Sequence, residues 1–426
     1  MALKAAATSA KPGSMPRADQ NRLQHSLDVM ASIGRQLDGS VKRLAFSAED
    51  QQARTLLSEW LIAAGASVYV DAAGNLIGRV AGIDSDLPAL VTGSHLDTVP
   101  TGGRFDGALG VLAGLEVIRC LKDNGWKLRH PLEVVAFADE ESTMVGCKGM
   151  TGTASNQTVD YSCTNGGQID RNLEAIGGDW DSLTTARRPS DSISAFIELH
   201  VEQGGILEQR GHSIGVVQGV VGQRRFVVRV DGTANHAGTT PMGGRQDALV
   251  AAAQAILCIQ NLAASHKGDP VATVGKLQVW PNAANVIPGQ VQMTVDLRDL
   301  SINVLEDLVH QLTSKLEEIS GFNGCDISLE PQFSVDPTPA DSIVAGAIAA
   351  VSTDLELSSS HLPSRASHDS QEIGRRWPMG MIFVPSRGGL SHSAAEFTSS
   401  RQCADGASVL LNSLVKLDQS LDQNHI

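Results

Sequence analysis

The sequence predicts an α/β fold with a mostly parallel sheet, interrupted by an inserted α+β domain. Its 426 residues exceed the ~250–300 at which a single hydrophobic core usually stops growing. In the first part of the chain, Val-rich apolar runs alternate with helical stretches, which is typical of a sheet with both faces covered. From residue 214 to residue 331 the pattern changes to a self-contained series of strands and helices.

The elements of the first part follow from the spacing of apolar residues. Helical spacing covers residues 22–33 and 48–64, and Ser47 in front of the second stretch predicts an N-cap, with Asp50 three residues later. A third helical stretch lies at 108–121. Short apolar runs predict strands at 67–71, 76–80, 89–92, 132–138 and 195–199.

The inserted domain is predicted to contain a sheet and two helices. Its strands are expected at 216–230, 271–280, 286–298 and 326–329, and its helices at 247–264 and 304–319. Three prolines within 331–341 indicate a linker that returns to the first domain. A helix at 343–351, a strand at 381–384 and a helix at 405–417 complete the chain. We therefore expect a catalytic domain in two parts, 1–213 and 332–426, around an inserted domain at 214–331.

Charge and composition exclude several classes of partner. The formal net charge is −14 and no cluster of Lys and Arg offsets it, so we expect no binding to nucleic acid or to anionic membranes. No apolar run reaches the ~20 residues that cross a bilayer, and the beginning of the chain lacks the apolar core of a signal peptide. The six cysteines show no CxxC pairing, which is typical of reduced thiols. We expect a cytoplasmic protein.

The first candidate site residues follow the strand at 89–92. His95 and Asp97 lie at its end, and Asp106 lies in a glycine-rich turn before a helix, where open α/β sheets place ligands. Such a histidine can bind a divalent metal, and Asp97 could fix its tautomer. An HxD pair alone also fits a surface histidine, and the turn lacks the order of a dinucleotide-binding GxGxxG motif.

Further acids and histidines follow other predicted strands. Glu140 and Glu141 end one strand, in an arrangement that also fits an exposed charged turn, and His200 and His392 each follow a later strand. If one glutamate binds a metal, the other can take a proton from water, as metal-assisted hydrolysis requires. Such a ligand set suits Zn²⁺, Mn²⁺, Co²⁺ or Ni²⁺ rather than Ca²⁺ or Mg²⁺. The chain has no HExxH or GxSxG motif that would indicate another class of hydrolase.

Taken together, these segments resemble the hydantoinase/carbamoylase branch of the M20 metallopeptidase-like amidohydrolases. This branch includes N-carbamoyl-L-amino-acid hydrolases, β-ureidopropionases and allantoate or ureidoglycolate amidohydrolases. The likeness runs almost end to end. The motifs that carry it are RLAFSAED, DAAGNLIGRVAG, GSHLDTVPTGGRFDGALGV, DEES, ELHVEQGGILE, NHAGTTPMGGRQDAL, NVIPGQVQMTVDLRD and GLSHSAAEF.

The resemblance implies a two-metal catalytic domain. Two divalent ions per subunit would share Asp106, Glu140 would be the general base, and Asp97 would orient His95. Apart from the shared aspartate, the implied ligands are His95 and His200 for one ion and Glu141 and His392 for the other.

The resemblance also implies that the inserted domain is a lid or dimerisation domain that contributes to substrate binding. His236 would polarise the scissile carbonyl in the active site of the partner subunit, which implies a homodimer. Asn285 and Arg298 would bind the substrate carboxylate, and Gln203 would also contact the substrate. From the residues alone, Arg298 also fits a surface ion pair and Asn285 a turn.

The chain departs from the family pattern at 364–370, where it reads SRASHDS and the family usually reads SGAGHDA. Arg365 and Ser367 replace small residues, so the local shape near the site is expected to differ. His368 and Asp369 are retained, with a supporting hydrogen-bond role implied.

The implied activity is metal-dependent hydrolysis of the ureido C–N bond of a small carboxylate substrate. An N-carbamoyl-L-amino acid or N-carbamoyl-β-alanine would yield ammonia, carbon dioxide and the amino acid. The alternatives are an allantoate or ureidoglycolate amidohydrolase, a dipeptidase or deacylase of the wider M20 group, and a metal-binding protein without activity. The retained Glu140 and the full ligand set speak against the last of these.

Overall fold

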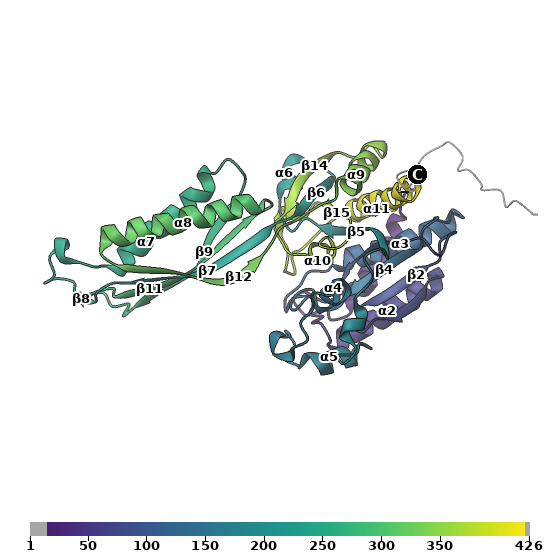
Figure 1. The fold of residues 1–426 in the computed structure, drawn as a ribbon. Helices are drawn as coiled ribbons and strands as arrows, with labels where there is room; N and C mark the ends of the chain where they lie inside the picture. Colours follow the sequence, from purple (N-terminus) through teal and green to yellow (C-terminus); the bar gives the residue numbers. More distant parts are fainter. Residues whose placement is uncertain (1–14, 422–426) are drawn as a thin grey trace, which may run out of the picture. The chain divides into compact units, whose positions relative to one another are not determined.

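The computed structural model describes residues 15–421, which fall into two compact units (Figure 1). The first unit takes the described residues of Met1–Val217, Asp341–Leu362 and Glu372–Ile426. The second takes Gln218–Ala340 and Pro363–Gln371. A segment in the middle of the chain thus forms a unit of its own, and each unit is described by itself below.

The sheet of the first unit has a parallel centre, which confirms the predicted α/β fold. Its strand order is β1-β2-β4-β3-β5-β15-β6, and β4, β3, β5 and β15 are parallel neighbours. The outer strands pair antiparallel. The strands are β1 (Ser67–Val70), β2 (Leu76–Val80), β3 (Ala89–His95), β4 (Leu132–Phe137), β5 (Ile193–Val201), β6 (Ile214–Val220) and β15 (Met379–Val384), with β14 (Ser359–Ser364) beside β6.

Helices pack on this sheet and bury its central strands. Every residue of β3 and β4 is buried, as expected for parallel strands covered on both faces. Helix α3 is buried along most of its length, and Gly110 lets it approach β5 so closely that a Cβ there would lie 2.4 Å from the Leu199 carbonyl oxygen. The helices are α1 (Gln20–Ser32), α2 (Ala48–Ala64), α3 (Ala108–Asp123), α4 (Val145–Thr151), α5 (Ile169–Ala175), α6 (Ile206–Arg210), α9 (Ser342–Asp354) and α11 (Ser400–Ser420), while α10 (Asp369–Ile373) begins in the second unit and ends in the first.

The predicted N-cap of helix α2 is confirmed. The Ser47 side chain accepts a hydrogen bond from the Asp50 backbone N–H at 3.2 Å. The Asp50 carboxylate in turn accepts from the backbone N–H of Phe46, one residue before the cap, at 2.8 Å. Two backbone donors at the start of the helix are thereby satisfied.

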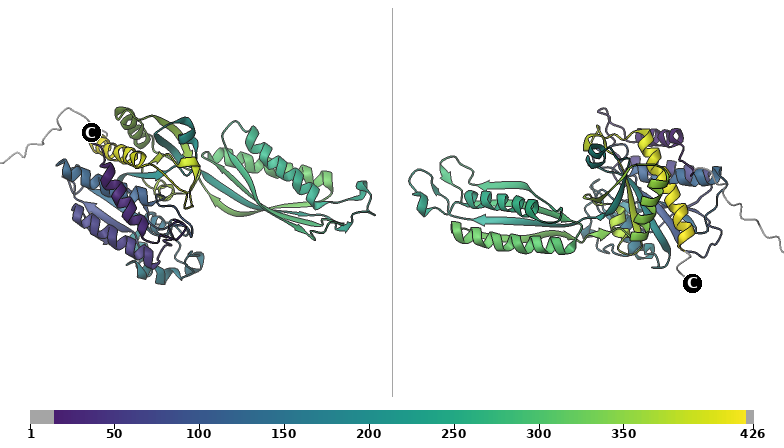
Figure 2. Two further views of the ribbon diagram at one scale, coloured as in Figure 1. Left: turned by 180° about the vertical axis from the view of Figure 1, so that it is seen from behind. Right: turned by 90° about the horizontal axis from the view of Figure 1, so that it is seen from above.

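The second unit is a four-stranded antiparallel sheet with two helices along one face (Figure 2). Its strand order is β12-β7-β11-β9. Along β11, Val291, Met293, Val295 and Leu297 are buried and alternate with more exposed polar residues, which is the period of two of a sheet with one covered face. The elements are β7 (Gly222–Asp231), β8 (Asn235–His236), β9 (Val271–Trp280), β10 (Val286–Ile287), β11 (Gln290–Asp299), β12 (Asp326–Val335), β13 (Thr338–Pro339), α7 (Ala248–Ser265) and α8 (Ile302–Asn323).

Three stretches differ from the prediction. The strand expected at 216–230 is two strands, because β6 ends at Val220, β7 begins at Gly222, and the two join different sheets. The strand expected at 286–298 is divided into β10 and β11. The linker expected at 331–341 is largely strand. Strand β12 runs through Pro331 with a register shift, which an edge strand tolerates because its free side needs no N–H donor.

One described helix, α7, is long and apolar enough to cross a membrane by length and composition alone. Its alanines, including Ala251, Ala252 and Ala255, are buried in the core of the second unit. The apolar character of α7 is therefore at least partly that of a helix packed on a sheet.

Candidate metal centre

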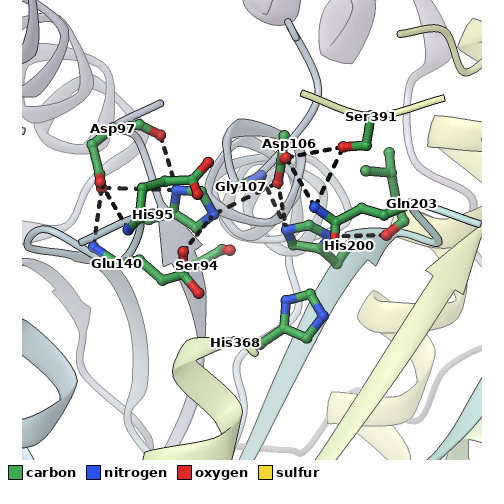
Figure 3. A network of polar contacts seen from close by, with 12 residues as sticks. Ser94, His95, Asp97, Asp106, Gly107, Glu140, His200, Gln203, His368 and Ser391 are labelled. Carbon is green, nitrogen blue, oxygen red and sulfur yellow. Dashed lines mark hydrogen bonds and ion pairs between the residues drawn. The ribbon is translucent and has the colours of Figure 1, made fainter. Parts of the chain in front are cut away.

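The candidate metal-site residues lie at one edge of the sheet of the first unit. Parallel neighbours end at the same edge, so β3, β4, β5 and β15 bring their following residues together there. His95 ends β3 and His200 is the next-to-last residue of β5. Glu140 follows β4, and His392 lies in the loop after β15. Figure 3 shows several of these side chains turned toward Asp106.

The Asp106 carboxylate lies between the imidazole rings. Its Oδ1 is 3.1 Å from His200 Nε2 and 3.8 Å from His95 Nε2, and its Oδ2 is 3.1 Å from His392 Nε2. The carboxylate is buried, although His392 itself is exposed. Asp106 is thus placed to contact partners on both of its oxygens.

Two groups of possible ligands share Asp106. The first is Asp106 with His95 and His200, and the second is Asp106 with Glu141 and His392. Within each group the donor atoms lie within 4.8 Å of one another. Glu140 forms a group with His95 and Glu141 but not with Asp106, and its Oε2 is 3.7 Å from His95 Nε2. Glu140 therefore lies beside His95 without completing either group around Asp106.

Main-chain oxygens fix the orientation of two of the rings. Nδ1 of His95 contacts the main-chain oxygen of Asp97 at 2.9 Å, and Nδ1 of His200 contacts that of Val201 at 2.8 Å. A proton on each Nδ1 leaves the lone pair of Nε2 facing Asp106, as a metal ligand requires.

The Asp97 carboxylate contacts the backbone of the loop after β4. It accepts hydrogen bonds from the backbone N–H groups of Glu140 and Glu141, at 3.4 Å and 3.2 Å. The contact predicted to orient His95 therefore comes mainly from the main chain of Asp97, while its side chain holds the loop that carries both glutamates.

Gly107 is required by the close approach of His95 to the start of helix α3. Its φ is 63°, in the left-handed region that favours glycine. A Cβ at this position would lie 2.5 Å from atoms of the His95 ring. No other residue type fits without moving the ring.

The electrostatics of the site fit a bound divalent cation. Burial raises the pKa of Glu141 to about 7. The hydrogen bond to Asp106 raises the pKa of His392 to about 8. Burial opposes charge on His200, but the hydrogen bond and charge of Asp106 outweigh it and raise that pKa to about 9. A buried glutamate that retains its proton, beside imidazoles that take protons up, indicates a cluster with too little positive charge, which a bound cation would supply.

Gln203 is the one predicted substrate-contacting residue in this unit. Its Nε2 donates to Asp106 Oδ2 at 3.0 Å. Its Oε1 is buried and has no hydrogen-bond partner among residues 15–421. An acceptor oxygen is thus available beside the candidate metal ligands.

His236 and Asn285 lie together in the second unit. His236 in β8 pairs with Val286 in β10, and the carbonyl of Asn285 accepts the backbone N–H of Ala237 at 3.0 Å. The His236 ring is exposed, and its Nδ1 accepts from the N–H of Gly238 at 3.0 Å. The ring proton therefore belongs on Nε2, which is left as a donor.

Arg298 lies in the four-stranded sheet, near the end of β11, where it pairs with Gln223 at the start of the unit. Its Nε donates to Asp296 at 2.8 Å and its Nη1 donates to the carbonyl oxygen of Arg365 at 2.7 Å. The Arg365 side chain reaches Asp269, with Nη2 2.7 Å from the carboxylate. The segment that departs from the family pattern thus contacts Arg298 directly.

The sequence did not predict a role for two residues of the site, Ser391 and Glu396. The Ser391 hydroxyl lies 3.1 Å from Asp106 Oδ2, and Glu396 accepts the backbone N–H groups of Phe105 and Asp106. The sequence feature that could have indicated Glu396 is its position, four residues after His392 in the motif GLSHSAAEF.

Known proteins match this chain along most of its length. The model of peptidase family M20/M25/M40 matches residues 91–416. An N-carbamoyl-L-amino acid amidohydrolase of Geobacillus stearothermophilus is 38% identical over 403 residues, which cover 93% of this chain and 98% of the relative. An allantoate amidohydrolase of Bacillus subtilis is 35% identical, with coverage of 93% and 98%.

A solved structure is also similar to this chain along most of its length. An amidase of the hydantoinase/carbamoylase family from Burkholderia multivorans matches with a TM-score of 0.88 and 36% identity, covering 94% of this chain and 98% of that chain.

Proposed function

The chain belongs to peptidase family M20/M25/M40, and we propose that it hydrolyses the ureido C–N bond of a small carboxylate substrate. An N-carbamoyl-L-amino acid or N-carbamoyl-β-alanine would yield ammonia, carbon dioxide and the amino acid. The names of the relatives support a ureido substrate. The observation that carries the proposal is the pair of ligand groups sharing Asp106, with Glu140 beside them.

Asp106 would be shared by two divalent cations, one held with His95 and His200 and the other with Glu141 and His392. The donor set of imidazoles and carboxylates suits Zn²⁺, Mn²⁺, Co²⁺ or Ni²⁺. When bound, such ions polarise a carbonyl group and lower the pKa of water.

Glu140 is the candidate general base. Its side chain is nearly buried, and its backbone N–H is held by the Asp97 carboxylate. We propose that Glu140 takes a proton from the attacking water and then delivers this proton to the leaving nitrogen. The water oxygen bonds to the ureido carbon, the C–N bond breaks to release ammonia, and the remaining carbamate loses carbon dioxide.

Gln203 and His236 have atoms suited to the ureido group. The unpartnered Oε1 of Gln203 can accept a ureido N–H. The Nε2–H of His236 can donate to the carbonyl oxygen as charge develops on it. Arg298 offers a guanidinium group to the substrate carboxylate.

A homodimer would explain the placement of the substrate-binding residues. Arg298 follows Gln290 by eight positions along β11, which is ~27 Å along a strand. Asn285 and His236 lie beyond the Gln290 end of the four-stranded sheet to which β11 belongs. One small substrate cannot contact both Arg298 and residues that lie beyond the other end of this sheet, so Arg298 and the pair His236 and Asn285 would come from two copies of the chain.

The second unit has a surface on which a second copy could pack. Strand β9 is an edge strand with an unpaired side within the described sheet, and it exposes Leu277 and Trp280. Helix α7, which packs against β9, exposes Val250 and Leu257. Exposed apolar edges of this kind favour association of identical copies.

The cytoplasm is the proposed location. All six cysteines are free and five are buried, as is typical of proteins in a reducing compartment.

A substrate panel tests the proposal. Metal-loaded protein would be offered N-carbamoyl amino acids, N-carbamoyl-β-alanine, allantoate, ureidoglycolate and dipeptides, with ammonia and amino acid release measured. We expect ammonia from at least one N-carbamoyl compound. Ammonia from allantoate alone would favour the alternative that the Bacillus subtilis relative suggests. Cleavage of dipeptides only would contradict the proposal.

A further inference from the structure

We propose that Glu396 is a positioning residue that fastens Asp106 in the orientation in which its two oxygens can be shared. The inference rests on the proposed function, since it concerns the same metal centre. Glu396 is 4% exposed and lies outside every described group of converging donor atoms around Asp106. It therefore acts through Asp106 rather than as a further ligand.

The Glu396 carboxylate holds the backbone of the loop that carries Asp106. Its Oε1 accepts the N–H of Phe105 at 2.7 Å and the N–H of Asp106 itself at 3.2 Å. Two donors on one oxygen fix the backbone at Asp106, from which the direction of the side chain follows.

Gly103 makes this contact possible. A Cβ at Gly103 would lie 2.1 Å from the carboxylate carbon of Glu396, so the loop can close over the carboxylate only because this residue has no side chain. The glycine-rich turn of the sequence is thus shaped around a side chain almost 300 positions later.

The second oxygen of Glu396 connects to the loop that carries His392. The Ser391 hydroxyl lies 3.2 Å from Glu396 Oε2 and 3.1 Å from Asp106 Oδ2. Ser391 directly precedes His392. A single carboxylate therefore joins the loop after β3 to the loop after β15, and sets the shared aspartate relative to His392.

Outer partners of this kind orient ligands and usually affect metal affinity or activity by ~10–100-fold. Glu396→Ala should lower Zn²⁺ affinity or kcat by about this factor, with little change in KM. Glu396→Gln should restore most of the loss. Its amide oxygen can accept the same two N–H groups, and its NH₂ can donate to Ser391, whose own proton remains for Asp106.

The matched control is Glu133→Ala. Glu133 is fully buried, makes ion pairs with Arg79 and Arg188, and lies near the start of β4, away from the edge that carries the metal ligands. Its removal should lower the free energy of unfolding without changing Zn²⁺ affinity or kcat per folded molecule.

For each variant we would measure the Zn²⁺ affinity of the apo-protein against a competing chelator, together with kcat, KM and thermal unfolding. The proposal is overturned if Glu396→Ala matches Glu133→Ala, losing stability while keeping the Zn²⁺ affinity and kcat of the wild type. If Glu396→Ala does not fold, Ser391→Ala decides in its place, and wild-type Zn²⁺ affinity and kcat in that variant overturn the proposal.

The same experiment separates this proposal from the proposed function. A wild-type protein that binds Zn²⁺ but releases no ammonia contradicts the ureido hydrolase, while a lower Zn²⁺ affinity in Glu396→Ala still supports the positioning role.

Discussion

The buried Asp106 carboxylate faces three imidazole rings. Its pKa is held well below the usual range by hydrogen bonds from His200 and His392, against the effect of burial. The sequence could predict that His95, Asp106 and His200 converge, because each follows a strand of one parallel sheet. It could not predict Glu396, whose partner Phe105 lies 291 positions away in a different loop.

Proton release should accompany metal binding. The pKa values of His200 and His392 are raised from 6.5 to about 9 and about 8, and that of Glu141 is raised to about 7. Below these values the groups hold protons that a cation must displace, so metal affinity should rise as the pH rises through them.

Calorimetric titration with Zn²⁺, in buffers of different ionisation enthalpy, measures the protons released. We expect about two per chain near neutral pH, with affinity falling as the pH is lowered. An affinity that is independent of pH across this range would show that these histidines are not the ligands.

At the scale of elements, the predictions were most accurate where helical spacing came with a cap and least accurate at glycines and prolines. Helix α2 begins where Ser47 predicts. The sequence does not predict the break between β6 and β7, because only the tertiary structure decides that the two segments join different sheets. Pro331 was read as linker, although an edge strand accommodates it.

Ser47→Ala should lower the free energy of unfolding by about 1 kcal/mol, because the backbone N–H of Asp50 loses its side-chain acceptor. Urea unfolding measures the change. Ser58→Ala is the control, since Ser58 lies within helix α2 and alanine is the better helix former there. Equal stability of Ser47→Ala and wild type would show that the cap does not contribute.

At the scale of the whole molecule, the sequence indicated a chain with an inserted middle segment, and the structure divides into two units. What the sequence could not give is the distance between the predicted substrate-binding residues. Asn285 and Arg298 are close in sequence, yet Asn285 lies before the start of the extended strand β11 and Arg298 lies near its end. We therefore propose that catalysis requires two copies of the chain.

Mixed dimers test this proposal. Glu140→Gln and His236→Ala should each be inactive alone. If His236 acts in trans, co-expression in equal amounts should restore about a quarter of the wild-type sites, because half of the dimers are mixed and each has one intact site. Activity of co-purified mixed dimers is the measurement, and no recovery in verified mixed dimers would show that His236 does not act across subunits.

Glu140→Gln tests the central claim most directly, that a carboxylate beside a shared-aspartate metal centre drives ureido hydrolysis. Metal content and ammonia release from the best N-carbamoyl substrate would be measured on the same preparation. We predict wild-type metal content with a loss of kcat of at least ~10²–10⁴-fold, the usual contribution of a general base. Loss of metal together with activity would make Glu140 a ligand, and retained turnover with full metal content would contradict its role as the base.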